Sequence, residues 1–320
     1  MGFTVENGKK LLLIYNPMSG REQTRKDLSY IVEVFCKAGF LPTVISTQKQ
    51  GDVIEIIESI GEEYDLIVTC GGDGTANEMT NGLVRLENRP KCGYIPTGTV
   101  NDFANSLKIP TRTTDAATVI TNQNFFNCDL CSFNGRIFNY VAGFGMFTNV
   151  SYVTPQESKN VWGKMAYFFE AVKRFAEYTP CHLEIEYEDQ KIEGSYILGL
   201  VSNSEYIASI DFYGKKNIKM DDGVFEVIMI KELKNPMEMQ DVLNALISRN
   251  FHSNYILRFQ TDYVKIHSKE NMSWTLDGED GGNVTDVEIK NIRRAIHIAV
   301  PMGNLSVAKH QPKQLEDINK

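Results

Sequence analysis

Short apolar runs alternate with stretches of helical periodicity along the first third of the chain. The apolar runs are LLLIYNP, PTVIST, DLIVTC and CGYIP. Strands that alternate with helices build parallel sheets covered on both faces, and continuous apolar strands suit burial on both sides. The pattern therefore predicts an α/β domain whose ligands lie at the carboxyl ends of its strands.

The pattern changes after about residue 129, where short strands follow one another with polar or glycine-containing turns between them. These runs are GRIFNYVAGFG, HLEIEYED, KIEGSYILGLVSN, GVFEVIMIK, YVKIHS and VTDVEIKN. Many short strands in succession are typical of an antiparallel sandwich or barrel. Two helical stretches interrupt them, at about 161–176 and 236–248. A chain of 320 residues is long enough for both domains.

Bulk composition excludes several classes of protein. The formal net charge of −8 argues against a nucleic-acid binder and against attachment to an anionic membrane by electrostatics alone. The six cysteines are scattered through apolar segments, so we expect reduced thiols in a cytoplasmic protein. The sequence shows no signal peptide or membrane-spanning stretch, because its first apolar run is far shorter than a bilayer requires.

The pentapeptide GGDGT, residues 71–75, stands directly between the buried strand DLIVTC and a helix. Glycines let the backbone approach a phosphate, and a helix start offers unpaired N–H groups and the positive end of the helix dipole. Asp73 would repel a bare phosphate, so its presence indicates Mg²⁺ or a substrate hydroxyl between the two. The alternative is a tight structural turn in which Asp73 caps the helix. The chain contains neither a Walker loop nor a GxGxxG dinucleotide-binding turn.

Three other polar turns follow strands of the same predicted sheet. Residues 96–102, PTGTVND, repeat the chemistry of the first turn, with a hydroxyl at Thr99 and a carboxylate at Asp102. Residues 16–20, NPMSG, follow the first strand, and Thr47 ends the second. Because adjacent parallel strands end at the same sheet edge, these turns should converge, and they predict a nucleotide site.

Two acidic, glycine-containing turns lie in the second half of the chain, DDG at 221–223 and DGE at 277–279. Phosphoryl transfer to an alcohol depends on positioning and charge neutralisation, and a carboxylate that accepts the hydroxyl proton assists it. Glu279 is our candidate for this general base. The simpler interpretation is that both clusters are β-turns.

Taken together, five motifs in this order resemble the diacylglycerol kinase catalytic-domain family of soluble bacterial lipid kinases. They are NPMSG, GGDGTANEMTNGL, IPTGTVNDFANSL, KMDDGVFEV and DGE. The resemblance extends over roughly residues 10–301, and the stretch VAGFGMFTNVSYVTPQESKNVWGKMAYF is similar to the bacterial diacylglycerol kinase branch. Sphingosine and ceramide kinases share the catalytic domain and are more distant candidates.

The resemblance implies an α/β + β fold: an N-terminal α/β nucleotide-binding domain with a mostly parallel sheet, and a C-terminal antiparallel β-sandwich domain. The active site would lie in the cleft between the domains. The last strand, RAIHIAVP, would return to the first domain. We therefore expect residues 9–129 plus 294–310 to form the nucleotide-binding domain and residues 130–293 to form the lipid-binding domain.

The resemblance also implies roles for individual residues at the nucleotide site. Asp73 and Asp102 would organise the transferred phosphate and its magnesium, and Glu279 would be the general base on the lipid hydroxyl. ATP would lie against Asn16, Pro17, Met18, Ser19, Gly20, Thr47, Gly72, Asp73, Gly74, Thr75, Ala76, Asn77, Glu78 and Thr99.

A second, structural Mg²⁺ is implied in the loop before the DDG strand. Its ligands would be the Lys219 carbonyl, the Asp222 side chain and the Val224 carbonyl. Asp129, expected after the last strand of the first domain, would join a network of carboxylates and water that links the two sites.

The implied activity is that of an ATP-dependent lipid kinase, a phosphotransferase with an alcohol acceptor. It would transfer the γ-phosphate of Mg-ATP to the hydroxyl of diacylglycerol and yield phosphatidic acid. Alternative acceptors are phosphatidylglycerol, ceramide, sphingosine or a soluble alcohol such as a nucleotide. An alternative outside the enzymes is a binding protein that senses a nucleotide or a lipid. The resemblance allows a homodimer.

A lipid substrate implies transient contact with a membrane surface, so we expect a cytoplasmic protein peripherally associated with the inner face of the membrane. The helix at 161–176 carries Trp162, Tyr167 and Phe169 on one edge, with basic residues nearby. Aromatic and basic side chains favour the membrane interface. The alternative is that one face of this helix packs on the sandwich and the basic side chains are merely solvated.

One segment departs from the pattern of the family. Many relatives follow SNS with a glycine run and a Pro-x-Ala before DDG, whereas this chain reads SNSEYIASIDFYGKKNIKMDDG. The stretch from Ile207 to Ile210 is bulkier than glycine, so we expect a different shape at the mouth of the lipid site.

Overall fold

The computed structural model describes residues 8–20, 23–145, 179–204, 206–207, 210–211, 219–249 and 251–303 of the chain. The helix expected at 161–176, with its aromatic edge and its basic residues, lies outside the described residues. The described part contains the four turns of the predicted nucleotide site and both acidic turns.

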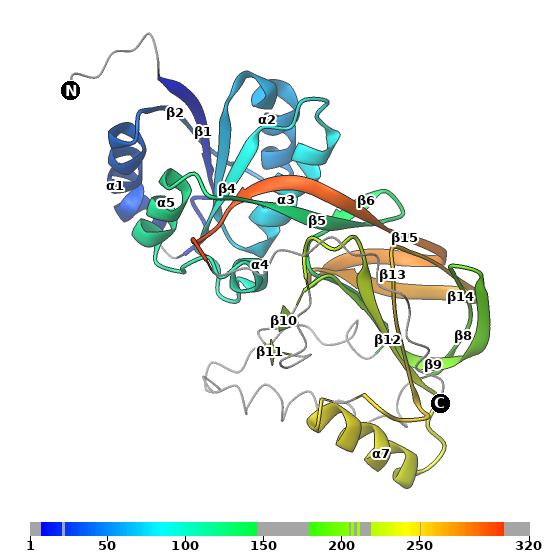
Figure 1. Cartoon of the computed structure of the whole chain (residues 1–320). Coiled ribbons are helices and arrows are strands. Elements are labelled where there is room, and N and C mark those ends of the chain that lie inside the picture. The colour runs from blue at the N-terminus through cyan, green and yellow to red at the C-terminus, as the bar shows by residue number, and fades with distance from the viewer. Residues whose placement is uncertain are drawn as a thin grey trace.

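The first half of the chain forms a parallel sheet with helices on both faces (Figure 1). Its strands, in the order β2-β1-β3-β4, are β1 (Lys9–Tyr15), β2 (Phe40–Ser46), β3 (Leu66–Gly71) and β4 (Lys91–Pro96). Its helices are α1 (Gln23–Lys37), α2 (Asp52–Ile60), the 3₁₀ turn η2 (Gly61–Glu63), α3 (Asp73–Arg85), α4 (Asp102–Ser106) and α5 (Thr113–Thr121). Helix α1 packs beside α5, and α2 packs beside α3. Every residue of β3 is buried, as expected for a strand covered on both sides.

Two helices of this half differ from the prediction. Helix α3 begins at Asp73, inside the GGDGT segment that was expected to precede it, because the extended Gly72 serves as its N-cap. The GGDGT turn is thus the first turn of the helix. Helix α5 was not expected, since its β-branched residues favour strands. Burial of Ala116, Ala117 and Ile120 outweighs that propensity.

The second half is mostly antiparallel. Its strands are β5 (Phe125–Phe133), β6 (Arg136–Phe138), β7 (Val141–Gly145), β8 (Cys181–Tyr187), β9 (Gln190–Ser202), β10 (Tyr206–Ile207), β11 (Ile210–Asp211), β12 (Phe225–Lys231), β13 (Ile256–Thr261), β14 (Tyr263–Leu276) and β15 (Glu279–Ala299). Helix α7 (Pro236–Ile247) begins where predicted, because the Asn235 side chain accepts hydrogen bonds from the N–H groups of Met237 and Glu238.

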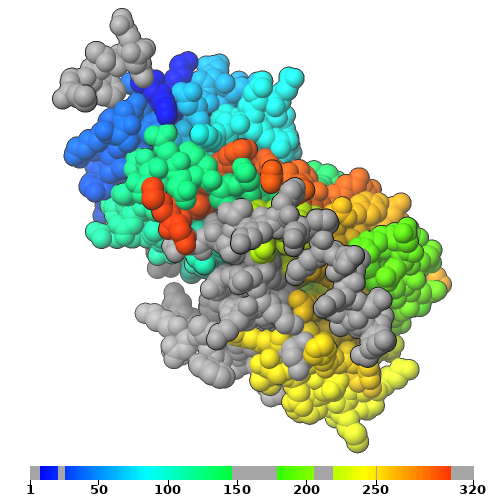
Figure 2. Space-filling model, in the orientation of Figure 1, coloured from blue at the N-terminus to red at the C-terminus, as the bar shows by residue number. Residues whose placement is uncertain are grey.

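A long strand, β15, joins the two halves into one sheet. It pairs antiparallel with β14 and β5, and its C-terminal end pairs parallel with β4 at Ile298 and Cys92. In the space-filling view its orange atoms lie along the boundary between the two halves (Figure 2). The expected return of the last strand to the first domain is therefore observed. The predicted strands at 284–291 and 294–301 are parts of this single strand.

Two clusters of buried side chains form the core. One fills the parallel sheet and its helices and continues into the second half as far as α7, and the other fills the inside of the antiparallel half. Trp274 is central to the second cluster, with its ring centroid 5.0 Å from that of Phe144 and 5.1 Å from that of Phe133. Trp274 and Leu276 are each 1% exposed, so the end of β14 is firmly anchored next to the DGE turn.

The boundary predicted at residues 129 and 294 falls inside β5 and β15, where their register shifts. Arg294 there has a left-handed backbone, with φ of 51°. The buried Asp129 carboxylate accepts hydrogen bonds from the N–H groups of Arg294 and Gly223, each at 2.6 Å. Asp129 thus lies within β5 and ties it to both β15 and the loop at 219–224. The boundary itself stays a prediction.

Candidate functional site

The carboxyl ends of β1 to β4 bring the polar turns together at one edge of the sheet. Each turn is hydrogen-bonded to the end of a neighbouring strand: Asn16 N–H to the Cys70 carbonyl at 2.9 Å, and Thr97 N–H to the Gly71 carbonyl at 2.8 Å. Thr47 N–H likewise donates to the end of β1. The convergence inferred from the strand pattern is therefore present.

Two of these turns touch backbone to backbone. A Cβ atom on Gly98 would lie 2.7 Å from the Cα atom of Gly72 and 2.8 Å from Oδ1 of Asn101, so only glycine fits there. The hydroxyls of Ser19 and Thr97 are hydrogen-bonded at 2.9 Å, which adds the NPMSG turn to the same group. These contacts form a compact, glycine-lined edge of the kind that phosphates approach.

Asp73 links the two glycine turns through its carboxylate. It accepts hydrogen bonds from the N–H groups of Asn101 at 2.8 Å and Phe103 at 3.5 Å, at the start of α4. Asp73 therefore caps the neighbouring helix and not its own, whose N-cap Gly72 supplies no side-chain bond. Burial raises the pKa of the Asp73 carboxyl, and the N–H donors offset part of that shift. Asp102, the first residue of α4, is also buried and is 1% exposed.

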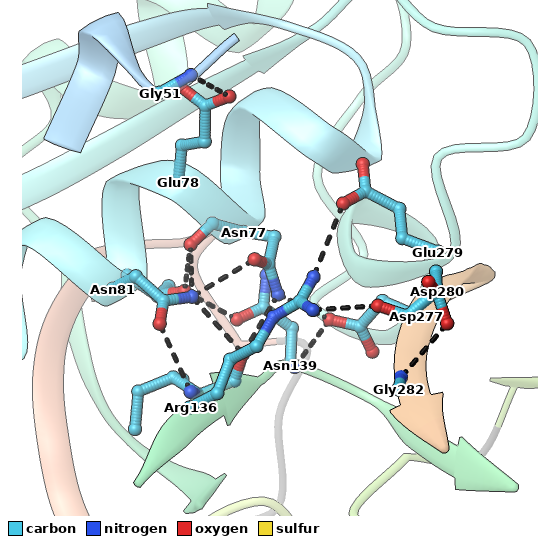
Figure 3. A network of polar contacts seen from close by, with 12 residues as sticks. Gly51, Asn77, Glu78, Asn81, Arg136, Asn139, Asp277, Glu279, Asp280 and Gly282 are labelled. Atoms are coloured by element: carbon cyan, nitrogen blue, oxygen red, sulfur yellow. Dashed lines mark hydrogen bonds and ion pairs between the residues drawn. The ribbon is translucent and has the colours of Figure 1, made fainter. Parts of the chain in front are cut away.

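Glu279, the candidate base, lies directly against the first turn of α3. A Cβ atom on Gly74 would be only 2.9 Å from Oε1 of Glu279. The other carboxylate oxygen faces Arg136 of β6, with 3.5 Å between Nη2 and Oε2, and the same guanidinium donates to the Asp280 carbonyl at 2.7 Å (Figure 3). Residues more than 200 positions apart in sequence thus meet at one site.

Several residues expected at the ATP site use their side chains inside the protein. The Glu78 carboxylate accepts from the N–H groups of Gly51 at 2.9 Å and Val53 at 3.2 Å, at the start of α2. The amide of Asn77 is buried and donates to Asp277. Thr75 and Ala76 are also buried, whereas Met18 and Thr99 are exposed. Their contacts with ATP stay predictions.

The loop at 219–224 gathers carboxylates around Asp129. Burial raises the pKa of the Asp222 carboxyl, and the like charge of the neighbouring Asp221 raises it further. Among the described residues, neither Asp129 nor Asp222 forms an ion pair. A bound cation would stabilise the charged forms of the Asp129 and Asp222 carboxylates. In the described ranges, however, no three His, Cys, Asp or Glu side chains are grouped to hold a metal, so backbone carbonyls would have to contribute.

Comparison with known proteins shows the family. The model of the diacylglycerol kinase catalytic domain matches residues 10–133, and that of the YegS C-terminal NAD kinase beta sandwich-like domain matches residues 142–300. A diacylglycerol kinase of Bacillus subtilis (strain 168) is 32% identical over 97% of this chain and 100% of its own length. The chain belongs to the diacylglycerol kinase family.

Other members of the diacylglycerol kinase family agree in sequence and in fold. A diacylglycerol kinase of Staphylococcus haemolyticus (strain JCSC1435) is 32% identical, over 95% of this chain and 92% of its own. A crystal structure of a diacylglycerol kinase from Bacillus anthracis str. Sterne superposes with a TM-score of 0.72 at 25% identity, over 92% of this chain and 97% of that chain. The predicted fold class and the resemblance are confirmed.

Arg136 is a site residue that the sequence pattern did not predict. Its only signal was a basic residue in the turn Asn134-Gly135-Arg136, which is ordinary for a hairpin. Its contact with Glu279 depends on the pairing of β6 with β5, which no local pattern shows.

We expect Arg136→Ala to lower turnover by about 3- to 30-fold, because Glu279 loses the cation that orients it. Steady-state kinetics with saturating ATP measures this. A matched control is Arg85→Ala, which breaks an exposed pair with Glu58 at the far end of α3. Equal turnover in the two variants would contradict a role for Arg136 at the site of this family member.

Proposed function

We propose that the chain is an ATP-dependent lipid kinase that transfers the γ-phosphate of Mg-ATP to the hydroxyl of diacylglycerol and yields phosphatidic acid. The observation that carries the proposal is the position of Glu279 against Gly74, at the helix start that follows the glycine turn. A carboxylate beside a phosphate-binding turn is placed to accept the proton of an attacking hydroxyl. The relatives from Bacillus subtilis and Staphylococcus haemolyticus are diacylglycerol kinases, which agrees with this substrate.

The residues present fit ATP and magnesium. Gly72 and Gly98 leave the backbone bare where the two turns meet, and the N-cap residue of α3, Gly72, has no side chain that could cap the helix. Asp73 accepts a hydrogen bond from the N–H group of Asn101, the residue before Asp102, and the two carboxylates would organise the phosphate and its cation. Bound Mg²⁺ would neutralise the charge that develops on the phosphate oxygens. Glu279 would hold the lipid hydroxyl by a hydrogen bond and take its proton.

Transfer of labelled phosphate from ATP tests the proposal directly. Diacylglycerol, phosphatidylglycerol, ceramide and sphingosine are offered in mixed micelles, and a nucleoside is offered in solution. We expect diacylglycerol to be phosphorylated fastest. Faster phosphorylation of another lipid would revise the proposed substrate but not the proposed phosphoryl transfer. Binding of ATP without transfer to any acceptor would favour the alternative of a protein that senses a nucleotide or a lipid.

We also propose a structural Mg²⁺ held by the Lys219 carbonyl, Asp222 and the Val224 carbonyl. We expect Mg²⁺ without nucleotide to raise the thermal unfolding midpoint of the wild type, because a bound ion stabilises the folded state by mass action. Asp222→Asn should abolish this increase, since the half-buried Asp222 carboxylate is the only charged group among the proposed ligands. Asp115→Asn, a surface substitution on α5, is the control that should retain it. An increase that persists in Asp222→Asn would contradict the site.

Contact with the inner face of a membrane, and homodimerisation, are further parts of the proposal. No helix in the described ranges is long and apolar enough to cross a bilayer. Vesicle sedimentation with Lys159, Lys164, Lys173 and Arg174 changed to Glu tests the docking surface predicted from sequence. Unchanged sedimentation would remove that surface from the proposal.

A further inference from the structure

Asp277 does more than form the turn before Glu279. Asp277 and Gly278 are the two-residue loop between β14 and β15, with φ of 51° and 85°, and Leu276 pairs with Glu279 across it. Asp-Gly is the usual sequence of such a loop, and the loop requires only the backbone of the aspartate. If the aspartate served the turn alone, its side chain could point into solvent.

The carboxylate of Asp277 is instead buried and fully engaged. One oxygen accepts from the N–H groups of Tyr140 at 3.0 Å and Val141 at 3.1 Å, and the other accepts from that of Asn139 at 2.6 Å. The residue is 8% exposed, and burial raises the pKa of its carboxyl to about 6 in spite of these donors. These three bonds hold the end of the hairpin against the segment between β6 and β7.

A fourth hydrogen bond crosses to the nucleotide-binding half. Nδ2 of Asn77, on α3, donates to Oδ2 of Asp277 at 2.9 Å and to the Ile137 carbonyl at 3.1 Å (Figure 3). Asn81, one turn further along α3, donates to Oδ1 of Asn77 and accepts from the N–H of Ile137. The polar face of α3 is thus fastened to β6 and to the hairpin.

The hairpin runs alongside the first turn of α3. Gly74 and Asn77 are three residues apart, so they lie on the same face of the helix. Glu279 meets Gly74, and Asp277, two residues earlier, meets Asn77. The contact between Asp277 and Asn77 therefore sets where along the helix the Glu279 carboxylate lies.

We propose that Asp277 and Asn77 are positioning residues for phosphoryl transfer, a pair that holds Glu279 over the start of α3. The proposal rests on the proposed function, in which Glu279 is the base. Since displacement of a reacting group by about 1 Å can cost about 10²-fold in rate, loosening this pair should reduce turnover without removing any group that touches substrate.

Asp277→Asn and Asn77→Ala test the pair. In the wild type, both carboxylate oxygens of Asp277 accept hydrogen bonds from N–H groups. In Asp277→Asn, the new NH₂ group would therefore face N–H donors in either orientation of the amide. We expect kcat to fall about 10- to 100-fold in Asp277→Asn and about 5- to 20-fold in Asn77→Ala, with KM for ATP within about threefold of wild type. The matched control is Asp280→Asn, because among the described residues that exposed carboxylate accepts a hydrogen bond from Gly282 of the same strand alone.

Each substitution is then repeated on a Glu279→Gln background, where residual turnover is followed at high enzyme concentration. If the pair acts through Glu279, neither substitution lowers kcat further; an added loss of the same factor would overturn the proposal. A raised KM for ATP with unchanged kcat in Asn77→Ala would also overturn it, because Asn77 would then be a nucleotide contact.

Failure of the pair can be told apart from failure of the proposed function. Normal turnover in Glu279→Gln would reject the base, and with it the function as proposed. Slow Glu279→Gln together with normal Asp277→Asn and Asn77→Ala would reject only the positioning pair. Thermal unfolding checks that each variant is folded, and Asn77→Ala decides alone if Asp277→Asn does not fold, since it leaves the three backbone bonds to Asp277 in place.

Discussion

Replacing Glu279 with glutamine is expected to lower kcat by about 10²- to 10⁴-fold while ATP affinity stays within about threefold of wild type. The amide keeps the size of the side chain and a hydrogen bond to the lipid hydroxyl, but it cannot accept the proton. ATP affinity should persist because the glycine turns and their hydroxyls come from other elements.

Single-turnover phosphate transfer and equilibrium ATP binding separate these two effects. The matched control is Glu288→Gln, on the same strand, whose half-exposed carboxylate pairs with Lys290 at the surface. It should keep wild-type values of both quantities, because exposed ion pairs contribute little. Near-normal transfer by Glu279→Gln would refute its role as the base and redirect attention to Asp73 and Asp102.

The second large effect is expected from a single methyl group at Gly98. Its Cβ would lie 2.7 Å from the Gly72 backbone, which cannot move aside as a flexible side chain would. Gly98→Ala should therefore push the two turns apart, with a loss of about 1–3 kcal/mol in the free energy of unfolding. We expect the Kd for ATP to rise at least about tenfold, because both turns leave their positions at the site.

Gly72→Ala separates crowding within the protein from crowding of the nucleotide. The nearest atom to its Cβ would be 3.5 Å away, an ordinary contact, so stability should remain close to wild type while ATP affinity falls. Chemical denaturation and nucleotide titration of both variants make the comparison. Wild-type stability and ATP binding in Gly98→Ala would show that the two turns are not packed against each other in solution.

The architecture of the first half was largely predictable because its signals are local. Continuous apolar runs such as Leu11–Ile14 are buried strands, and the glycine turns after them mark where they end. Parallel strands share one edge for their carboxyl ends, so convergence of the turns followed from topology alone. Helix α5 was missed because its burial, and not its propensity, makes it helical.

The part of the site that depends on contacts between segments far apart in the sequence could not be predicted from local patterns. The order DGE predicted a turn and a candidate base, but not that Asp277 faces inward while Glu279 faces Gly74. Arg136 and Asn139 reach the site because β6 packs beside α3, a contact between segments about 60 residues apart. Asn77 and Glu78 follow the GGDGT motif in the sequence, which led to their prediction as ATP contacts. Their side chains are instead hydrogen-bonded to Asp277 and to the start of α2.

The strand β15 has a consequence for synthesis of the protein. It contributes the neighbour of β4 in the parallel sheet, and it is made only after some 280 residues have left the ribosome. Until then β4 is an open edge, which is a place where strands of other chains can attach. The nascent N-terminal half must wait for its final strand, so we expect a truncated chain ending at residue 145 to aggregate and not to fold as an independent unit.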